Sequence, residues 1–223
     1  MMGIDNKCRR IAVVIPAFNE QEAIGEIVRK VSVLANAIVV DDGSHDGTAE
    51  VALAAGAEVV SHKTNQGYDH ALETGMRRAL ALGFDAAITM DADGQHQPET
   101  LLAFIEALQN GAELVVGIRD RRQRISETVF AGCGSLLWGI KDPLCGMKGY
   151  QLSLLQKAGR FDTYSSIGTE LAIRAAKSGC SVSQVQVPTQ ARNGVSRFGG
   201  GWRPNYWIIR ALVLGVFNAP KFN

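Results

Sequence analysis

The first half of the chain alternates two hydrophobic patterns of different period. Short apolar runs, which are typical of buried strands, recur at residues 10–16, 37–41, 58–61, 86–90 and 113–117. Between them, apolar residues spaced three and four apart predict helices over 20–35, 46–55, 69–82 and 98–109. A chain with this alternation forms a mostly parallel sheet that helices cover on both faces. We therefore expect an α/β fold.

The second half follows a less regular pattern. It predicts a helix over 124–138, a short strand at 146–151, a helix over 166–178 and a strand at 181–189. A loop rich in Gly and Arg follows, and we expect residues 1–204 to form a single domain. Residues 205–217 are apolar but too few to cross a bilayer. We expect the tail, 205–223, to be a helix that docks on the core or on another subunit, or that lies at a membrane surface.

Composition limits the class of protein. The 23 Lys and Arg residues balance 22 Asp and Glu residues, so no overall field attracts nucleic acid, and we expect no such partner. The four cysteines are scattered without a C-x-x-C pair, which argues against a zinc knuckle or a disulfide framework and is typical of a reducing cytoplasm. No leader-like apolar core follows the first Met, and no run reaches the roughly 18 apolar residues of a membrane span. We expect a cytoplasmic protein, soluble or peripheral at the inner face of the cytoplasmic membrane.

Two carboxylates follow the predicted strand at 86–90, in the run Asp91-Ala92-Asp93-Gly94-Gln95. Open α/β sheets bind ligands at the carboxyl ends of their strands. Carboxylates this close repel each other unless a cation lies between them, and oxygen ligands suit Mg²⁺ or Mn²⁺, which commonly bridge to phosphate. The run therefore predicts a metal–diphosphate site, with Asp91, Asp93 and Gln95 as candidate ligands.

Polar motifs also follow the first two predicted strands, at 16–20 and 41–48. Asn19 and Asp46 are placed to cap the helices that come next. Because capping needs only one acid, Asp42 is available to accept hydrogen bonds from a ribose or base. The chain has no G-x-G-x-x-G after the first strand and no Walker G-x-x-x-x-G-K. A bound nucleotide would therefore have its diphosphate held by metal.

Together these motifs resemble the family 2 glycosyltransferases of the GT-A fold, and among them the polyprenyl-phosphate sugar transferases of the dolichol-phosphate mannosyltransferase type. The matching words are V-I-P-A-F-N-E at 14–20, V-D-D-G-S-H-D-G-T at 40–48 and D-A-D-G-Q-H-Q-P-E at 91–99. Shorter matches occur at 117–119, 142–148 and 192–197, so the resemblance covers residues 11–198. It implies a Rossmann-like GT-A sheet with an irregular, acceptor-side second half.

The resemblance implies a role for each matching residue. Those around the nucleoside are Pro16, Phe18, Glu20, Val40 and Asp42. Those at the diphosphate and the metal are Asp91, Ala92, Asp93 and Gln95. Those against phosphates of donor or acceptor are Arg119, Arg192 and Arg197. The chain departs from the family at Phe18, where Tyr is frequent, and at Arg197, where Lys is usual and the spacing from the preceding Arg is one residue shorter. The implied donor is a GDP- or UDP-linked sugar, and the implied cofactor is Mg²⁺ or Mn²⁺.

The charges of the reaction indicate the roles of the catalytic residues. A departing sugar gains positive charge at its anomeric carbon while the diphosphate gains negative charge, which a divalent ion and arginines stabilise. A sugar-hydroxyl acceptor needs a general base, whereas a lipid phosphate is already anionic and needs only positive charge, as the basic cluster 119–124 supplies. Asp93, Arg119 and Asp142 are the candidate catalytic residues. Either Asp142 or Glu170 is placed to orient the sugar, or to act as base for a hydroxyl.

We therefore expect an inverting, metal-dependent glycosyltransferase that acts on a dolichyl or undecaprenyl phosphate in cell-envelope glycan or glycoconjugate synthesis. Two alternatives stay open: transfer to a sugar hydroxyl of a growing polysaccharide, and a sugar-nucleotide-binding subunit without turnover. A sugar nucleotidyltransferase would carry a glycine-rich basic loop directly after the first strand, and a D-x-D phosphatase would carry its acidic pair there. This chain has neither. Peripheral contact with a membrane or a membrane partner, and an oligomer, are compatible with this interpretation.

Overall fold

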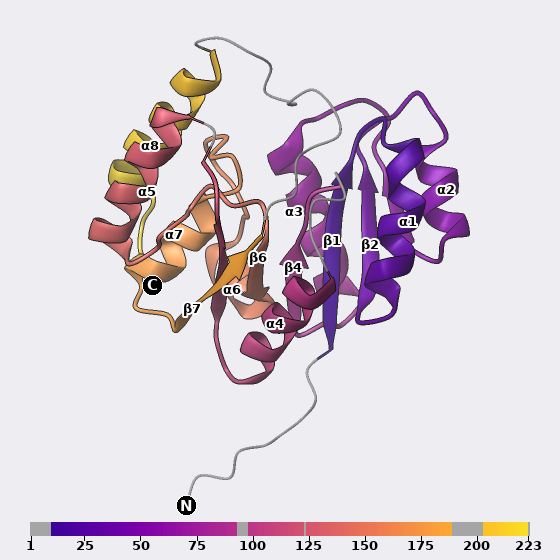
Figure 1. The fold of residues 1–223 in the computed structure, drawn as a ribbon, viewed down its shortest axis with the longest axis horizontal. Helices are drawn as coiled ribbons and strands as arrows, with labels where there is room; N and C mark the ends of the chain where they lie inside the picture. Colours follow the sequence, from indigo (N-terminus) through magenta and orange to yellow (C-terminus); the bar gives the residue numbers. More distant parts are fainter. Residues whose placement is uncertain (1–9, 93–97, 123, 189–202, 223) are drawn as a thin grey trace, which may run out of the picture.

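The computed structural model describes residues 10–92, 98–122, 124–188 and 203–222. In these ranges the chain forms a seven-stranded sheet with the order β3-β2-β1-β4-β6-β5-β7 (Figure 1). The strands are β1 (Ile11–Ala17), β2 (Asn36–Asp41), β3 (Glu58–Ser61), β4 (Ala86–Thr89), β5 (Leu114–Arg119), β6 (Lys148–Gln151) and β7 (Val182–Val187). Strand β6 is antiparallel to both of its neighbours, and the other pairs are parallel. The expected mostly parallel α/β sheet is confirmed.

Helices cover both faces of this sheet. On one face lie α1 (Gln21–Ser32), α2 (Thr48–Ala54) and α4 (Pro98–Gln109), and on the other lie α3 (Tyr68–Ala81), α6 (Leu152–Ala158) and α7 (Glu170–Lys177). Two further helices, α5 (Ile125–Trp138) and α8 (Arg203–Asn218), pack against each other beyond α7 (Figure 1). The core is thus two apolar layers separated by the sheet.

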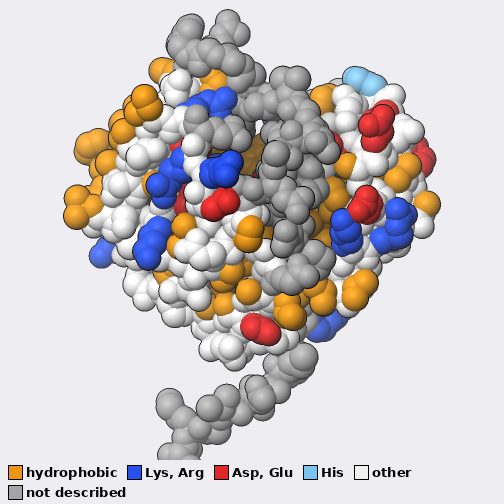
Figure 2. Space-filling model, in the orientation of Figure 1, with side chains coloured by type: hydrophobic (Ala, Val, Ile, Leu, Met, Phe, Trp, Pro, Cys, Tyr) orange, Lys and Arg blue, Asp and Glu red, His pale blue; other side chains and the backbone are white. Residues whose placement is uncertain are grey.

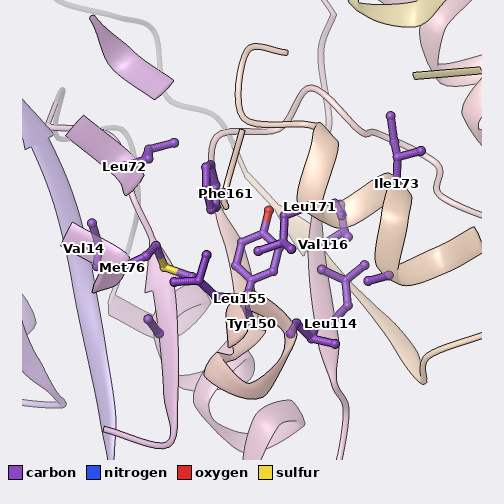
Figure 3. Packing of buried hydrophobic residues seen from close by; sticks show 14 of the residues in the cluster. Val14, Leu72, Met76, Leu114, Val116, Tyr150, Leu155, Phe161, Leu171 and Ile173 are labelled. Carbon is purple, nitrogen blue, oxygen red and sulfur yellow. The ribbon is translucent and has the colours of Figure 1, made fainter. Parts of the chain in front are cut away.

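The side-chain period of a strand decides which layer each residue joins. In β1, Val13 and Ile15 belong to the layer under α1, whereas Val14 belongs to the layer under α3. Figure 3 shows this second layer, where Tyr150 of β6 meets Phe161 edge to face with ring centroids 5.8 Å apart. Because consecutive β1 residues are buried on opposite faces, the whole strand is apolar, and it is the central element that positions the loops at its carboxyl end.

The second half differs from the sequence prediction in two places. Helix α6 was not expected, since seven residues directly after a strand give too short a pattern to separate helix from strand. The predicted helix over 166–178 begins only at Glu170. Ser165 and Ile167 have φ of 55° and 58°, which a right-handed helix does not allow, and Ser166 Oγ accepts hydrogen bonds from the amides of residues 169 and 170.

Helix α8 docks on the domain through one face. Ile208, Ala211 and Leu212 are buried in the layer under α3, and the Lys177 ammonium donates to the carbonyls of Gly215, Val216 and Ala219 at the end of α8. These carbonyls have no partners further along the helix, so Lys177 satisfies the helix end and fixes it to α7. Within the described ranges, no helix combines the length and the apolar character that crossing a membrane requires.

Candidate functional site

The three acidic and polar motifs of the sequence meet at one edge of the sheet. Strands β2, β1 and β4 are neighbours and run in the same direction, so their carboxyl ends lie side by side. Pro16 pairs with Val40 on the β2 side, while the β4 pairing ends at Val14, so the missing amide of Pro16 costs the ladder no hydrogen bond. Among the described residues, this edge therefore brings those expected around a nucleoside next to Asp91 and Ala92, which are expected at the diphosphate.

The loops after β1 and β2 are held together by hydrogen bonds between their side chains and amides. The Asn19 amide donates to Ser44 Oγ, and Asn19 Oδ1 accepts from the His45 amide, both at 2.9 Å. The prediction that Asn19 caps the next helix is wrong, because its carboxamide is used across the two loops and Asn19 itself is left-handed, with φ 54°. The Asp46 carboxylate does accept hydrogen bonds at the starts of two helices, from the amides of Gln21 in α1 and Thr48 in α2.

Phe18 lies half-buried in this pair of loops, edge to face with the His45 ring at 6.4 Å. Glu20 is also half-buried, and its amide donates to Thr48 Oγ1 at 2.9 Å. The hydrogen bonds between the loops thus fix the positions of the residues that the resemblance places at the nucleoside. Their contact with a nucleoside stays a prediction.

Asp42 holds the segment between β3 and α3. Its carboxylate is only 4% exposed and accepts from the amides of Gln66 at 2.9 Å and Gly67 at 2.8 Å. His62 Nδ1 lies 2.7 Å from the same carboxylate, and its other ring nitrogen lies 2.9 Å from Thr74 Oγ1. A carboxylate offers about four acceptor positions, so Asp42 keeps capacity for one more donor while it fixes the start of α3.

Asp91 follows β4 and is partly exposed, with a contact on each carboxylate oxygen. Tyr68, the first residue of α3, donates its hydroxyl to Asp91 Oδ1 at 3.1 Å. On the other side the Gly146 backbone lies so close that a Cβ there would overlap Asp91 Oδ2 and stand 2.9 Å from Cγ. Burial, followed by the charge of Asp91, raises the pKa of Tyr68, so the hydroxyl stays a donor. Asp91 is therefore held in one orientation.

The strand-end oxygens fit a divalent cation. Asp91 presents a carboxylate at the carboxyl end of β4, and the glycine beside it leaves space that a side chain would fill. The other proposed ligands, Asp93 and Gln95, lie outside the described residues, and so do Arg192 and Arg197. In the part of the chain that the structure describes, no three His, Cys, Asp or Glu side chains form a metal-binding group. Asp91 is the described residue that would hold Mg²⁺ or Mn²⁺, and Ala92 beside it is fully buried.

Arg119 and Asp142, two predicted catalytic residues, contact each other. Arg119 at the end of β5 donates from Nε at 2.8 Å and from Nη2 at 3.0 Å to the two oxygens of Asp142, which is 1% exposed. The Arg119 amide donates to the same carboxylate, and Glu127 lies 3.4 Å from Nη1. Burial alone would lower the pKa of Arg119, but its bonds to Asp142 outweigh that effect and raise it. Arg119 is a fixed cation whose planar group is set by Asp142.

Glu170, the other acid considered for the acceptor side, is also bound within the protein. It is 1% exposed, and its two oxygens accept from the amide and hydroxyl of Thr163 at 2.6 to 2.9 Å. Arg174 lies 3.8 Å away. Burial raises the pKa of Glu170. Its carboxylate fixes the start of α7 and the loop before it.

Sequence reasoning missed three residues of this edge. Tyr68 and Gly146 contact Asp91 directly, and Lys148 is a buried cation whose ammonium donates to the Cys145 carbonyl. Burial lowers the pKa of Lys148, and the charges of Cys145, Asp142 and Asp91 oppose that shift. The available signal was weak: a Gly-Tyr pair before a predicted helix, and a glycine in the 142–148 word.

The fold defines the structural class of the protein. Its seven-stranded, mostly parallel sheet with helices on both faces is the fold of the GT-A glycosyltransferases. Glucosyl-3-phosphoglycerate synthase from Mycobacterium tuberculosis, solved with Mn²⁺, uridine diphosphate and glucosyl-3-phosphoglycerate, superposes with a TM-score of 0.74 at 23% identity, over 95% of this chain and 80% of that one. This similarity confirms the expected fold.

Sequence comparisons then give the family. The protein-family model described as glycosyl transferase family 2 matches residues 12–131. Dolichyl-phosphate hexose transferase of Haloferax volcanii is 30% identical over 219 residues, covering 91% of this chain and 94% of that protein. Polyprenol monophosphomannose synthase of Mycolicibacterium smegmatis is 34% identical over 218 residues, covering 86% and 82%. The chain belongs to glycosyl transferase family 2, and it is a glycosyltransferase.

Proposed function

We propose that this glycosyltransferase moves a sugar from a GDP- or UDP-linked donor to a polyprenyl phosphate, with inversion at the anomeric carbon. The donor would lie across the ends of β1, β2 and β4, with its base near Asp42 and its diphosphate near Asp91. A divalent ion bound there would act as a Lewis acid on the leaving diphosphate. The M. tuberculosis synthase, which has the same fold, was solved with Mn²⁺ and uridine diphosphate, and this supports the use of a divalent ion with a nucleoside-diphosphate donor.

The acceptor class is inferred from the burial and the hydrogen bonds of the Asp142 and Glu170 carboxylates. Both are 1% exposed, and in each the two oxygens already accept hydrogen bonds from the protein. A sugar hydroxyl needs a base to take its proton, whereas a phosphate attacks as an anion. Both carboxylates considered as bases are thus engaged elsewhere, which favours an acceptor that needs none. We propose that Asp142 acts by positioning Arg119, whose guanidinium supplies charge for a phosphate.

The relatives point to the same acceptor. The names of the H. volcanii and M. smegmatis proteins, a dolichyl-phosphate hexose transferase and a polyprenol monophosphomannose synthase, describe transfer to lipid phosphates. A lipid acceptor requires access to a membrane surface. We propose that the chain reaches it peripherally, from the cytoplasmic side.

Helices α5 and α8 supply a surface suited to this contact. On their outer side they expose a set of large apolar side chains, namely Ile125, Val129, Leu136 and Leu137 of α5 and Tyr206, Trp207, Ile209, Val213 and Phe217 of α8. Figure 2 shows hydrophobic side chains at the edge where Figure 1 places these two helices. Arg121 and Arg122, both exposed, lie four and three residues before the start of α5. Apolar side chains beside cations suit the interface of an anionic membrane.

An acceptor panel tests the proposal. Purified enzyme receives labelled UDP- and GDP-sugars with Mn²⁺ and one acceptor: a dolichyl or undecaprenyl phosphate, the matching unphosphorylated polyprenol, 3-phosphoglycerate, or a neutral oligosaccharide. The proposal predicts transfer to the polyprenyl phosphate and none to the polyprenol. Transfer to the oligosaccharide alone would assign a hydroxyl acceptor, and transfer to 3-phosphoglycerate alone would assign a soluble phosphate. Donor binding without transfer to any acceptor would favour a binding subunit.

A further inference from the structure

One short segment contacts both ends of the proposed donor site. Gln66 and Gly67 directly precede α3, and Tyr68 is its first residue. The amides of Gln66 and Gly67 donate to Asp42, and the Tyr68 hydroxyl donates to Asp91. Gly67 has φ 94° and ψ 164°, a conformation that essentially only glycine adopts. The backbone is therefore fixed just before Tyr68, and Asp42 and Asp91 are connected through three residues.

From this geometry we infer that Tyr68 is a positioning residue, which sets the orientation of the Asp91 carboxylate toward the metal and diphosphate of the donor. The inference rests on the proposed function, since it takes Asp91 to be a metal–diphosphate residue. The Tyr68 hydroxyl occupies one acceptor position on Oδ1, and the Gly146 backbone limits the movement of Oδ2. With both oxygens confined, this partly exposed carboxylate is held in one orientation.

The interaction is of a kind that tunes metal sites. Hydrogen bonds to a metal-binding carboxylate hold it in the geometry that the ion requires, and removing such a partner typically lowers metal affinity by about 10- to 100-fold. Tyr68 is half-buried, and its ring lies where a Cβ added at Gly168 would stand 3.4 Å from it. Replacing it with Phe keeps this packing and removes only the hydroxyl.

The test compares Tyr68→Phe with Tyr150→Phe. Tyr150 is a suitable control because it is also a tyrosine of the core layer under α3, fully buried, and its hydroxyl has no hydrogen-bond partner among the described residues. Two affinities are measured for each variant: that of Mn²⁺ at saturating UDP or GDP, followed by electron paramagnetic resonance, and that of the nucleotide without metal, followed by calorimetry. Thermal unfolding of each variant is recorded alongside.

We expect Tyr68→Phe to weaken Mn²⁺ binding by about tenfold, with metal-free nucleotide affinity and melting temperature unchanged, and Tyr150→Phe to change neither affinity. Equal Mn²⁺ affinity in Tyr68→Phe and wild type overturns the inference, and so does an equal loss of both affinities, which indicates a general structural role. If the wild-type chain binds neither nucleotide with Mn²⁺, the proposed function fails, and the inference fails with it. Wild-type binding that Asp91→Ala weakens and Tyr68→Phe does not refutes the inference alone.

Discussion

Replacing Gly146 with alanine should lower the activity of the enzyme without lowering the stability of its fold. The new Cβ would overlap Asp91 Oδ2 and stand 2.9 Å from Cγ and 3.1 Å from Oδ1. Non-bonded atoms prefer about 3.5 Å or more, so the carboxylate must move by about 1 Å. The atoms that move are the end of a partly exposed side chain, and Gly146 has no positive φ, so the cost to folding is small.

The cost to function should be large. A displacement of about 1 Å in a catalytic arrangement lowers the rate by about 100-fold, equivalent to about 2.7 kcal/mol. We therefore expect Gly146→Ala to reduce kcat/KM for sugar transfer by about 100-fold and to leave the melting temperature nearly unchanged.

The assay is labelled-sugar transfer at varied donor concentration, with thermal unfolding on the same samples. Gly132→Ala is the matched control, because Gly132 lies in helix α5 and an added Cβ there would meet nothing within 4 Å. This control should gain about 0.5–1 kcal/mol of stability without loss of activity. Wild-type activity in Gly146→Ala would refute the reasoning about Asp91. A large fall in melting temperature would place the effect of Gly146 in the fold instead.

Three further predictions concern the fold and its surface. Burial, followed by the nearby charge of Asp162, raises the pKa of Asp69 from 3.8 to about 6. The stability that this shift gives is complete below pH 3.8 and is lost as pH rises through 6, so between pH 4 and pH 7 the free energy of unfolding of Asp69→Asn should rise relative to wild type by up to about 3 kcal/mol. Urea unfolding measures this difference, and a difference that stays constant with pH would contradict the prediction. Lys177→Ala removes three hydrogen bonds to the end of α8 and should lower the free energy of unfolding by about 1–3 kcal/mol, whereas Lys30→Ala, at an exposed helix pair, should change it little. Replacing Leu136 and Phe217 together with Ser, at positions 85% and 80% exposed, should weaken binding to anionic vesicles in a flotation assay, while Val33→Ser just after α1, at 81% exposed, should not. Equal binding by the wild type, the double variant and Val33→Ser would reject the membrane surface.

The first half of the fold was predictable because each element carries its own periodicity. A buried parallel strand such as β1 is apolar throughout, and α1 shows its apolar face at helical spacing, so both are visible locally. The start of α7 was not predictable in the same way. It depends on Ser166 accepting two amides and on left-handed residues before it, and the spacing of apolar residues carries no information about either.

The candidate site was likewise predictable only in part. Asp42 and Asp91 were identifiable because they follow apolar runs that end at one edge of the sheet. Their partners were not, since Tyr68 meets Asp91 only because α3 docks beside β4, and Arg119 meets Asp142 only because the chain returns past β5 before it forms β6. Contacts set by tertiary packing rather than by the strand ends themselves therefore need the structure.

A single metal–diphosphate site at the carboxyl ends of β1, β2 and β4 is central to the proposed function. Anomalous diffraction from crystals soaked with Mn²⁺ and UDP or GDP tests it directly. We predict one Mn²⁺ peak in direct contact with an Asp91 oxygen and with the diphosphate, and the base beside Asp42. A Mn²⁺ peak away from Asp91, or a nucleotide bound elsewhere on the sheet, would contradict the proposed site.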